Sequence, residues 1–155
     1  MASIQKLTTC LWFDGNAEAA AEFYLSVFKN AKLGRISHYP NDGQVLVVEF
    51  EIEGQKFLGL NGGPQFKLSE AVSFIVSCDT QSEIDYYWEK LTADGGAPGQ
   101  CGWLKDKFGL SWQVAPSKIG DWITDQDKSK SARVFAAVMQ MAKLDIATLE
   151  KAFDG

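Results

Sequence analysis

The sequence predicts an α+β fold that consists of two similar halves followed by a helical tail. Three observations lead to this prediction. A chain of 155 residues with 46% hydrophobic side chains is long enough for one domain with a sizeable core. The order strand, helix, several strands occurs twice, which is a weak internal repeat. Beyond residue 127, apolar positions recur only at helical spacing.

The first half is predicted to contain one helix and four strands. Residues 7–13 (LTTCLWF) are β-branched and aromatic and end in a turn, which is typical of a strand. Asn16 is the predicted N-cap of a helix over residues 17–29. Three more strands are expected after it, each separated from the next by turn residues. These strands are residues 32–39, 45–53 and 56–61.

The second half repeats this order in a shorter form. Residues 71–78 read as a strand, and Thr80 with Glu83 forms a capping box that opens a second helix. Strands are expected at residues 101–106 and 110–115.

The tail is predicted to be helical. Asp127 is expected to cap a helix over residues 128–142, and Asp145 to start another. Their apolar stripes must cover either the chain's own sheet or a second subunit, and the stripes alone leave both open.

The composition excludes several classes of site. The chain has one histidine, His38, so it cannot supply the ligands of a two-histidine iron site or a three-histidine zinc site. Its three cysteines form no C-x-x-C pair, and an odd number without a signal peptide favours a soluble, cytoplasmic protein. The net charge of −5 without a basic cluster argues against nucleic acid, and the short apolar N-terminal run argues against a membrane span.

A few residues could carry chemistry. Glu49 lies opposite the apolar face of its strand, where it would be either solvated or, in an apolar cavity, a base with a raised pKa. Cys101 has small neighbours that could leave its thiol accessible, but the favoured interpretation is a small apolar side chain at the start of a strand. Trp12, Trp88 and Trp112 are expected in the helix-facing layer, whereas Trp103 could line a pocket.

Several motifs resemble one known family. They are Trp12-Phe13-Asp14-Gly15-Asn16-Ala17, Glu22-Phe23-Tyr24, Leu60-Asn61-Gly62-Gly63-Pro64, Ser73-Phe74, Tyr87-Trp88-Glu89-Lys90-Leu91 and Cys101-Gly102-Trp103-Leu104-Lys105-Asp106-Lys107-Phe108-Gly109. Together they resemble the PhnB-like family, whose members often carry the label 3-demethylubiquinone 3-methyltransferase-like. This family belongs to the vicinal oxygen chelate superfamily, with the glyoxalases, bleomycin resistance proteins and extradiol dioxygenases.

The resemblance implies a glyoxalase-like fold. In that fold, paired βαβββ modules form cupped mixed sheets, and a homodimer usually completes them. We therefore expect a single domain over residues 1–155, with modules at about 5–64 and 69–116 and C-terminal helices at about 127–154.

The superfamily's metal is not expected here. Alignment on Phe23-Tyr24 places the ligand positions at Thr9, near Asn61, near Ala71 and at Gln113. None is a histidine or a carboxylate, whereas divalent ions need such ligands to offset their dehydration. The methyltransferase label also implies a glycine-rich loop after the first strand, and Asp14-Gly15-Asn16-Ala17 lacks it. No metal and no cofactor are therefore expected.

These expectations define a metal-independent protein that binds a small organic ligand in the cupped sheet. Its ligand-binding residues are expected to be Thr9, Asn61, Ser73, Trp103 and Gln113. The alternative is an enzyme, with either group or methyl transfer or proton transfer at Glu49. A third hypothesis is a dimerisation module with a vestigial cavity.

Overall fold

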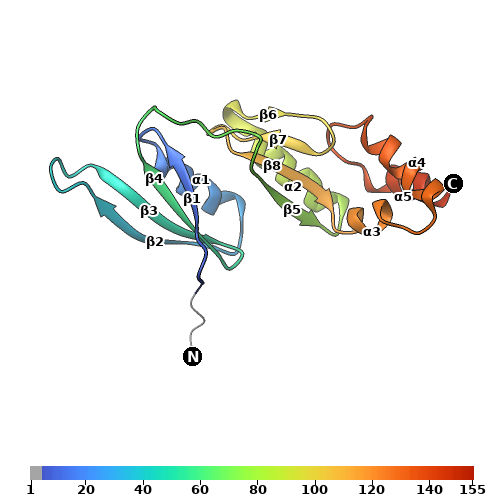
Figure 1. The fold of residues 1–155 in the computed structure, drawn as a ribbon, viewed down its shortest axis with the longest axis horizontal. Helices are drawn as coiled ribbons and strands as arrows, with labels where there is room; N and C mark the ends of the chain where they lie inside the picture. Colours follow the sequence, from blue (N-terminus) through green and yellow to red (C-terminus); the bar gives the residue numbers. More distant parts are fainter. Residues whose placement is uncertain (1–4) are drawn as a thin grey trace. The chain divides into compact units, whose positions relative to one another are not determined.

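The computed structural model of the chain describes residues 5–155. They belong to two compact units, Met1–Leu68 and Ser69–Gly155 (Figure 1).

The first unit contains one helix and a four-stranded mixed sheet. Its elements are β1 (Thr9–Phe13), α1 (Ala17–Val27), β2 (Ala31–His38), β3 (Val45–Ile52) and β4 (Gln55–Asn61). The strand order is β1-β4-β3-β2, with β1 parallel to β4 and the other pairs antiparallel. The predicted βαβββ order is confirmed, and each predicted element lies within a few residues of its expected bounds.

Helix α1 covers one face of this sheet. Phe50, at the centre of β3, stacks on Tyr24 of the helix at 5.9 Å and on Phe57 of β4 at 5.3 Å between ring centroids. All three side chains are buried, together with Val48 and Ile52 on the same side of β3. Because side chains alternate along a strand, the intervening residues point to the other face, which we call the open face.

The N-cap predicted for α1 is wrong. Asn16 makes no side-chain hydrogen bond to the helix, and its φ of −114° and ψ of 24° are not those of an extended N-cap. Instead, the Ala17 N–H donates to Asn61 Oδ1 at 2.9 Å. The helix is therefore capped from β4, a long-range contact that local sequence does not encode.

The second unit repeats the topology. Its sheet and helices are β5 (Ser73–Cys78), α2 (Gln81–Thr92), the 3₁₀ turn η1 (Ala93–Gly95), β6 (Ala97–Pro98), β7 (Trp103–Lys105) and β8 (Ser111–Pro116). The strand order is β5-β8-β7-β6, and β5 is parallel to β8. Thr80 Oγ1 accepts from the Glu83 N–H at 3.2 Å, so the predicted cap of α2 is confirmed. Strand β6 was not predicted, because its two residues lie in a glycine-rich stretch typical of turns.

The tail forms three helices, α3 (Ile119–Ile123), α4 (Lys128–Val138) and α5 (Ile146–Asp154). Asp127 and Asp145 cap the last two as predicted, although α4 ends at Val138 rather than at residue 142. The short α3 was not predicted. No helix within residues 5–155 is long and apolar enough to cross a bilayer.

The tail packs on its own unit. Its helices bury one cluster made of Trp122, Val134, Val138, Leu144 and Leu149. Cys101 and Ala115, from the sheet side, pack against this cluster. Two backbone bonds join the same regions, from the Cys101 N–H to Met141 O (2.7 Å) and from the Gly102 N–H to Ala142 O (2.8 Å). The sequence left open whether the tail covers its own sheet or a second subunit. In the structure, the tail covers part of its own second unit.

Candidate functional site

Three of the predicted ligand-binding residues lie together on the open face of the second sheet. Gln113 of β8 donates from Nε2 to Ser73 Oγ of β5 at 3.0 Å. Trp103 of β7 lies directly opposite Gln113 in the strand register. The alternate residues of β8, Trp112 and Val114, are buried on the side of α2. The open face therefore presents two neutral polar groups beside an indole ring.

Ser111 lies on the same face and was not predicted. It is the register partner of both Ser73 and Lys105, and it is fully buried. Its Oγ has no hydrogen-bond partner among residues 5–155. A buried hydroxyl without a partner costs about 1–3 kcal/mol. The two-residue period from Gln113 was the signal in the sequence that could have placed Ser111 here.

Thr9 does not lie on an open face. Thr9 is the register partner of Phe57 and shares its side of β1 with Leu11 and Phe13. Phe57, Leu11 and Phe13 are all buried toward α1. The β1 residues on the open side are Cys10 and Trp12. An error of one residue in the alignment is enough for this difference, because a shift by one moves a strand residue to the other face.

Asn61 has structural partners at both ends of its amide. Its Oδ1 accepts from the Ala17 N–H at 2.9 Å, and its Nδ2 donates to Val45 O at 3.1 Å. The side chain therefore caps α1 and joins the end of β4 to the start of β3. Each of these two groups is thus already engaged in one structural hydrogen bond.

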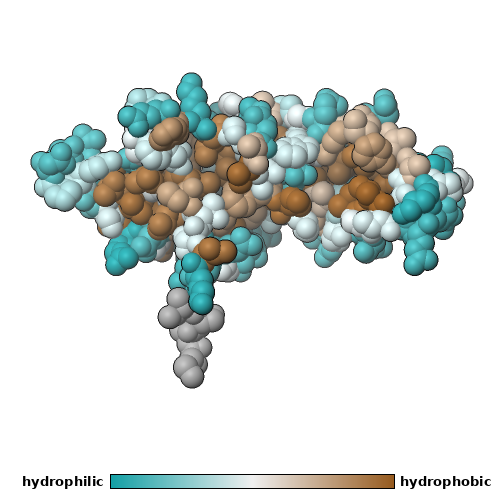
Figure 2. All heavy atoms as spheres, viewed as in Figure 1, coloured by the Kyte–Doolittle hydropathy of each residue, from teal (hydrophilic) through white to brown (hydrophobic). Residues whose placement is uncertain are grey.

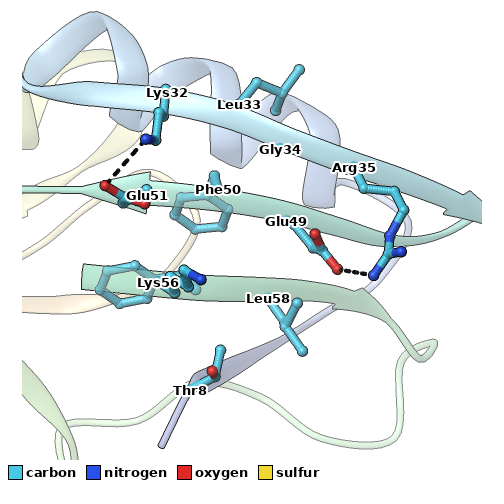
Figure 3. A pocket seen from close by; sticks show the side chains of 11 residues that line it. Thr8, Lys32, Leu33, Gly34, Arg35, Glu49, Phe50, Glu51, Lys56 and Leu58 are labelled. Atoms are coloured by element: carbon cyan, nitrogen blue, oxygen red, sulfur yellow. Dashed lines mark hydrogen bonds and ion pairs between the residues drawn. The ribbon is translucent and has the colours of Figure 1, made fainter. Parts of the chain in front are cut away.

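Glu49 lies on the open face of the first sheet, in a hollow of about 410 Å³ (Figure 3). Its Oε1 accepts from Arg35 of β2 at 2.9 Å. One row along the sheet, Lys32 Nζ lies 3.6 Å from Glu51 Oε1. Lys56 of β4 is the register partner of Glu51 and completes this row. The hollow is thus crossed by charged side chains.

A β-bulge brings Arg35 to Glu49. Leu33 pairs with Phe50 and Ile36 pairs with Val48, so Gly34 and Arg35 together oppose the single residue Glu49. A Cβ at Gly34 would lie 3.0 Å from Glu49 Cβ, which is tighter than ordinary contacts. The bulge therefore needs glycine here, and the extra residue turns Arg35 onto the same face as Glu49.

The Arg35 guanidinium lowers the pKa of the Glu49 carboxyl below its ordinary value, chiefly through the hydrogen bond between them. The Glu49 side chain is 36% exposed, so it is neither enclosed nor desolvated strongly enough to oppose this effect. A general base at neutral pH needs a pKa shifted in the opposite direction. The environment of Glu49 suits a structural ion pair better than a base.

Trp12 was predicted in the helix-facing layer, and this prediction is wrong. It lies half-buried on the open side of β1, and its Nε1 donates to Gly63 O at 2.8 Å. A Cβ at Gly62 would lie 2.3 Å from the Trp12 ring, so only glycine permits this close approach. Hydrophobic residues gather over the strands of this unit in Figure 2. Trp12 thus fixes the segment that follows β4.

Two units of βαβββ order, each with a mixed sheet and one open face, define a glyoxalase-like protein of the vicinal oxygen chelate class. The profile of the family described as 3-demethylubiquinone-9 3-methyltransferase matches residues 5–115, and the chain belongs to this family. No curated protein matches the sequence.

Solved structures agree with this assignment. The PhnB protein of Bacillus cereus is 35% identical, with a TM-score of 0.66, over 72% of this chain and 99% of that chain. Protein PA1353 of Pseudomonas aeruginosa is 19% identical, with a TM-score of 0.60, over 74% of this chain and 98% of that one. The fosfomycin resistance protein FosX of Mesorhizobium loti is 15% identical, with a TM-score of 0.54, over 72% and 91% of the two chains. The last two show the fold alone.

The superfamily's metal does not fit the side chains present. Ser73 and Gln113 are neutral, and Glu49 is held by Arg35. A second hollow of about 550 Å³ is lined by Asp14, Glu18 and His38, among others. Across residues 5–155, however, no three His, Cys, Asp or Glu side chains are grouped closely enough to hold a metal ion.

S-adenosylmethionine, which the family description implies, does not fit either. In nucleotide-binding folds, a glycine-rich loop leaves backbone amides at a helix N-terminus free for the ligand. Here β1 leads through Asp14 and Gly15 directly into α1, and Asn61 already holds the Ala17 amide.

Proposed function

We propose that this chain is a small-molecule-binding protein that holds an organic ligand on the open face of its second sheet without a divalent metal. The hydrogen-bonded pair of Ser73 and Gln113 beside Trp103 is the observation that carries this proposal. Ligand sites typically combine a large apolar or aromatic surface with a few polar groups that fix orientation.

The pair also suggests what kind of ligand fits. Ser73 Oγ accepts from Gln113, so its own hydrogen is available for donation, and Gln113 Oε1 is available to accept. Among the described residues, neither atom has a further partner. One donor and one acceptor beside an indole ring suit a neutral, planar molecule that carries both functions, such as an aromatic amide.

Benzamide is the probe that tests this proposal. When it is added to the full chain, we expect the amide NMR signals of Ser73, Trp103 and Gln113 to shift. Gln113→Leu keeps the size of the side chain and removes its polar groups, and it should weaken binding about two- to tenfold, as loss of a neutral hydrogen bond does. Gln140→Leu changes an exposed glutamine of the same unit and should leave binding unchanged. Shifts elsewhere, or unchanged binding to Gln113→Leu, would contradict the proposal.

Metal independence has its own test. Native mass spectrometry of the purified protein, combined with metal analysis, should show no stoichiometric divalent ion. A stoichiometric ion would overturn this part of the proposal. A small molecule retained through purification would identify the natural ligand.

Proton transfer at Glu49 remains the competing hypothesis, as part of an enzyme. Its test is the pKa of the Glu49 carboxyl, measured by NMR with the side chain isotopically labelled. We expect a value below the ordinary value of about 4.3. A value well above it would favour the base over the binding protein.

A homodimer in the cytoplasm completes the proposal. Val72 and Ile75 are exposed to 61% and 62%, and such side chains are frequent in subunit interfaces. Cys10, Cys78 and Cys101 are all free thiols, which supports a reducing compartment. Sedimentation equilibrium of the purified protein tests the dimer, and a monomer at micromolar concentration would contradict it.

A further inference from the structure

The side chains that line the hollow on the first sheet carry a net positive charge, whereas the whole chain is negatively charged. The chain carries a net charge of −5, but the hollow is lined by three cations, Lys32, Arg35 and Lys56, and only two carboxylates. A local excess of positive charge within an acidic protein attracts anions to that place and to few others.

The excess charge lies at Lys56. Arg35 is bound to Glu49 at 2.9 Å, and Lys32 is paired with Glu51 at 3.6 Å. Lys56 makes no ion pair of 4.0 Å or less within residues 5–155, although it lies beside Glu51 in the register. Figure 3 shows the Lys56 side chain at β4, and no dashed line joins its ammonium to either pair.

Glu49 is held by the backbone of β2 as well as by its ion pair with Arg35. The bulge at Gly34 and Arg35 holds the arginine over Glu49, and a Cβ at Gly34 would crowd the glutamate. Glu49 is therefore a poor partner for an incoming cation, because Arg35 must first be displaced. The arrangement disfavours amines and leaves one ammonium open to an anion.

An apolar surface adjoins Lys56. Leu58 lies two residues further along β4 on the same open face and is half-buried, and Thr8 lies at the edge of the hollow (Figure 3). The volume of about 410 Å³ is within the range of small-molecule sites. The hollow thus offers a cation beside a hydrocarbon surface.

We propose that this hollow binds small organic acids, with the carboxylate on Lys56 and the apolar body on Leu58. This site uses other residues than the one of the proposed function, which is built from neutral groups of the second sheet. Both carboxylates of the hollow already have a cationic partner on β2, so amines are disfavoured there.

Benzoate, benzamide and benzylamine test the proposal, because they share a ring and differ in charge. Amide NMR of the full chain should show benzoate shifting the signals of residues 34–35 and 56–58. At these residues benzoate should bind about three- to tenfold more tightly than benzamide, and benzylamine should not bind. Raised salt should weaken benzoate alone.

Three variants separate the ammonium from other causes. Lys56→Met keeps the aliphatic stem and should abolish the preference for benzoate over benzamide. Lys29→Met removes the same charge from an exposed position outside the hollow and should preserve the preference. Glu49→Gln removes a negative charge from the hollow and should strengthen benzoate binding.

Three outcomes would each overturn the proposal. They are a preference for benzoate that survives in Lys56→Met, equal binding of benzoate and benzamide at the hollow, and no benzoate shifts there at millimolar concentration. None of these outcomes concerns benzamide at Ser73 and Gln113, so the two proposals can fail independently.

Discussion

Asp106 is the residue whose carboxylate holds the connection between β7 and β8 together. It lies between β7 and β8 and is 2% exposed, and its carboxylate accepts three hydrogen bonds. Oδ1 accepts from the Phe108 N–H at 2.9 Å and the Leu110 N–H at 3.1 Å, and Oδ2 accepts from Trp112 Nε1 at 2.9 Å. In Asp106→Asn, one oxygen becomes an NH₂ group. If the oxygen of the asparagine amide keeps the two backbone hydrogen bonds, its NH₂ group must face the indole N–H of Trp112. Two donors then face each other, and neither can accept.

We therefore expect Asp106→Asn to lose the bond to Trp112 and to leave a buried donor without a partner, at a cost of about 2–4 kcal/mol. Urea unfolding followed by far-UV circular dichroism measures this cost. Trp112→Phe removes the indole donor, so in Asp106→Asn/Trp112→Phe the second substitution should relieve part of the first. The two should couple by about 1–2 kcal/mol in a double-mutant cycle. Additive effects, or a loss below about 0.5 kcal/mol, would refute the reasoning.

Three further predictions concern stability. Ser111→Ala removes the buried hydroxyl without a partner and should raise the free energy of unfolding by about 1 kcal/mol; a clear loss in urea unfolding would mean that the hydroxyl has a partner. Gly62→Ala should lower the free energy of unfolding by about 2–4 kcal/mol, because the new Cβ displaces the Trp12 ring and breaks its hydrogen bond to Gly63. Gly120→Ala, where a Cβ meets nothing within 4 Å, should be nearly neutral. Equal melting temperatures of the two variants would contradict this prediction. Hydrogen bonds lower the pKa values of Glu49, Glu70, Asp85, Asp127 and Asp145. Their folded pKa values lie below the unfolded ones, so their stabilisation is complete above the ordinary carboxyl pKa and is lost as the pH falls through the folded values. The melting temperature should therefore hold at neutral pH and fall below about pH 4, and a maximum in acid would contradict the shifts.

The fold could be predicted from the sequence because its signals are local and repeated. The alternation in β3 and the caps at Thr80, Asp127 and Asp145 each depend on a few neighbouring residues, and all were confirmed. The cap of α1 was wrong because its acceptor, Asn61, lies 44 residues away. Helix α3 has only five residues, too few to produce a clear periodic pattern.

The candidate site could be predicted only in part, because it depends on which face of a strand each residue occupies. Ser73, Trp103 and Gln113 lie on one face because neighbouring strands in register carry them, and their role in binding a ligand stays a prediction. Thr9 lies on the α1 side of β1 with Leu11 and Phe13, a face that the sequence alone did not assign. The bulge at Gly34 and Arg35 shifts the alternation within β2, and the glycine inside that strand was a local signal for the bulge that the sequence analysis did not use.

The tail lies beyond the part of the chain that the family profile matches, which ends at residue 115. It is nevertheless joined by backbone bonds to Cys101 and Gly102, the two residues that come just before Trp103. Backbone bonds do not depend on which side chains the tail carries. The tail can therefore change in sequence without losing these two bonds, and a change in its length or path acts directly on the residues that precede Trp103. A segment beyond the profile match thus helps to position one wall of the ligand site that we propose.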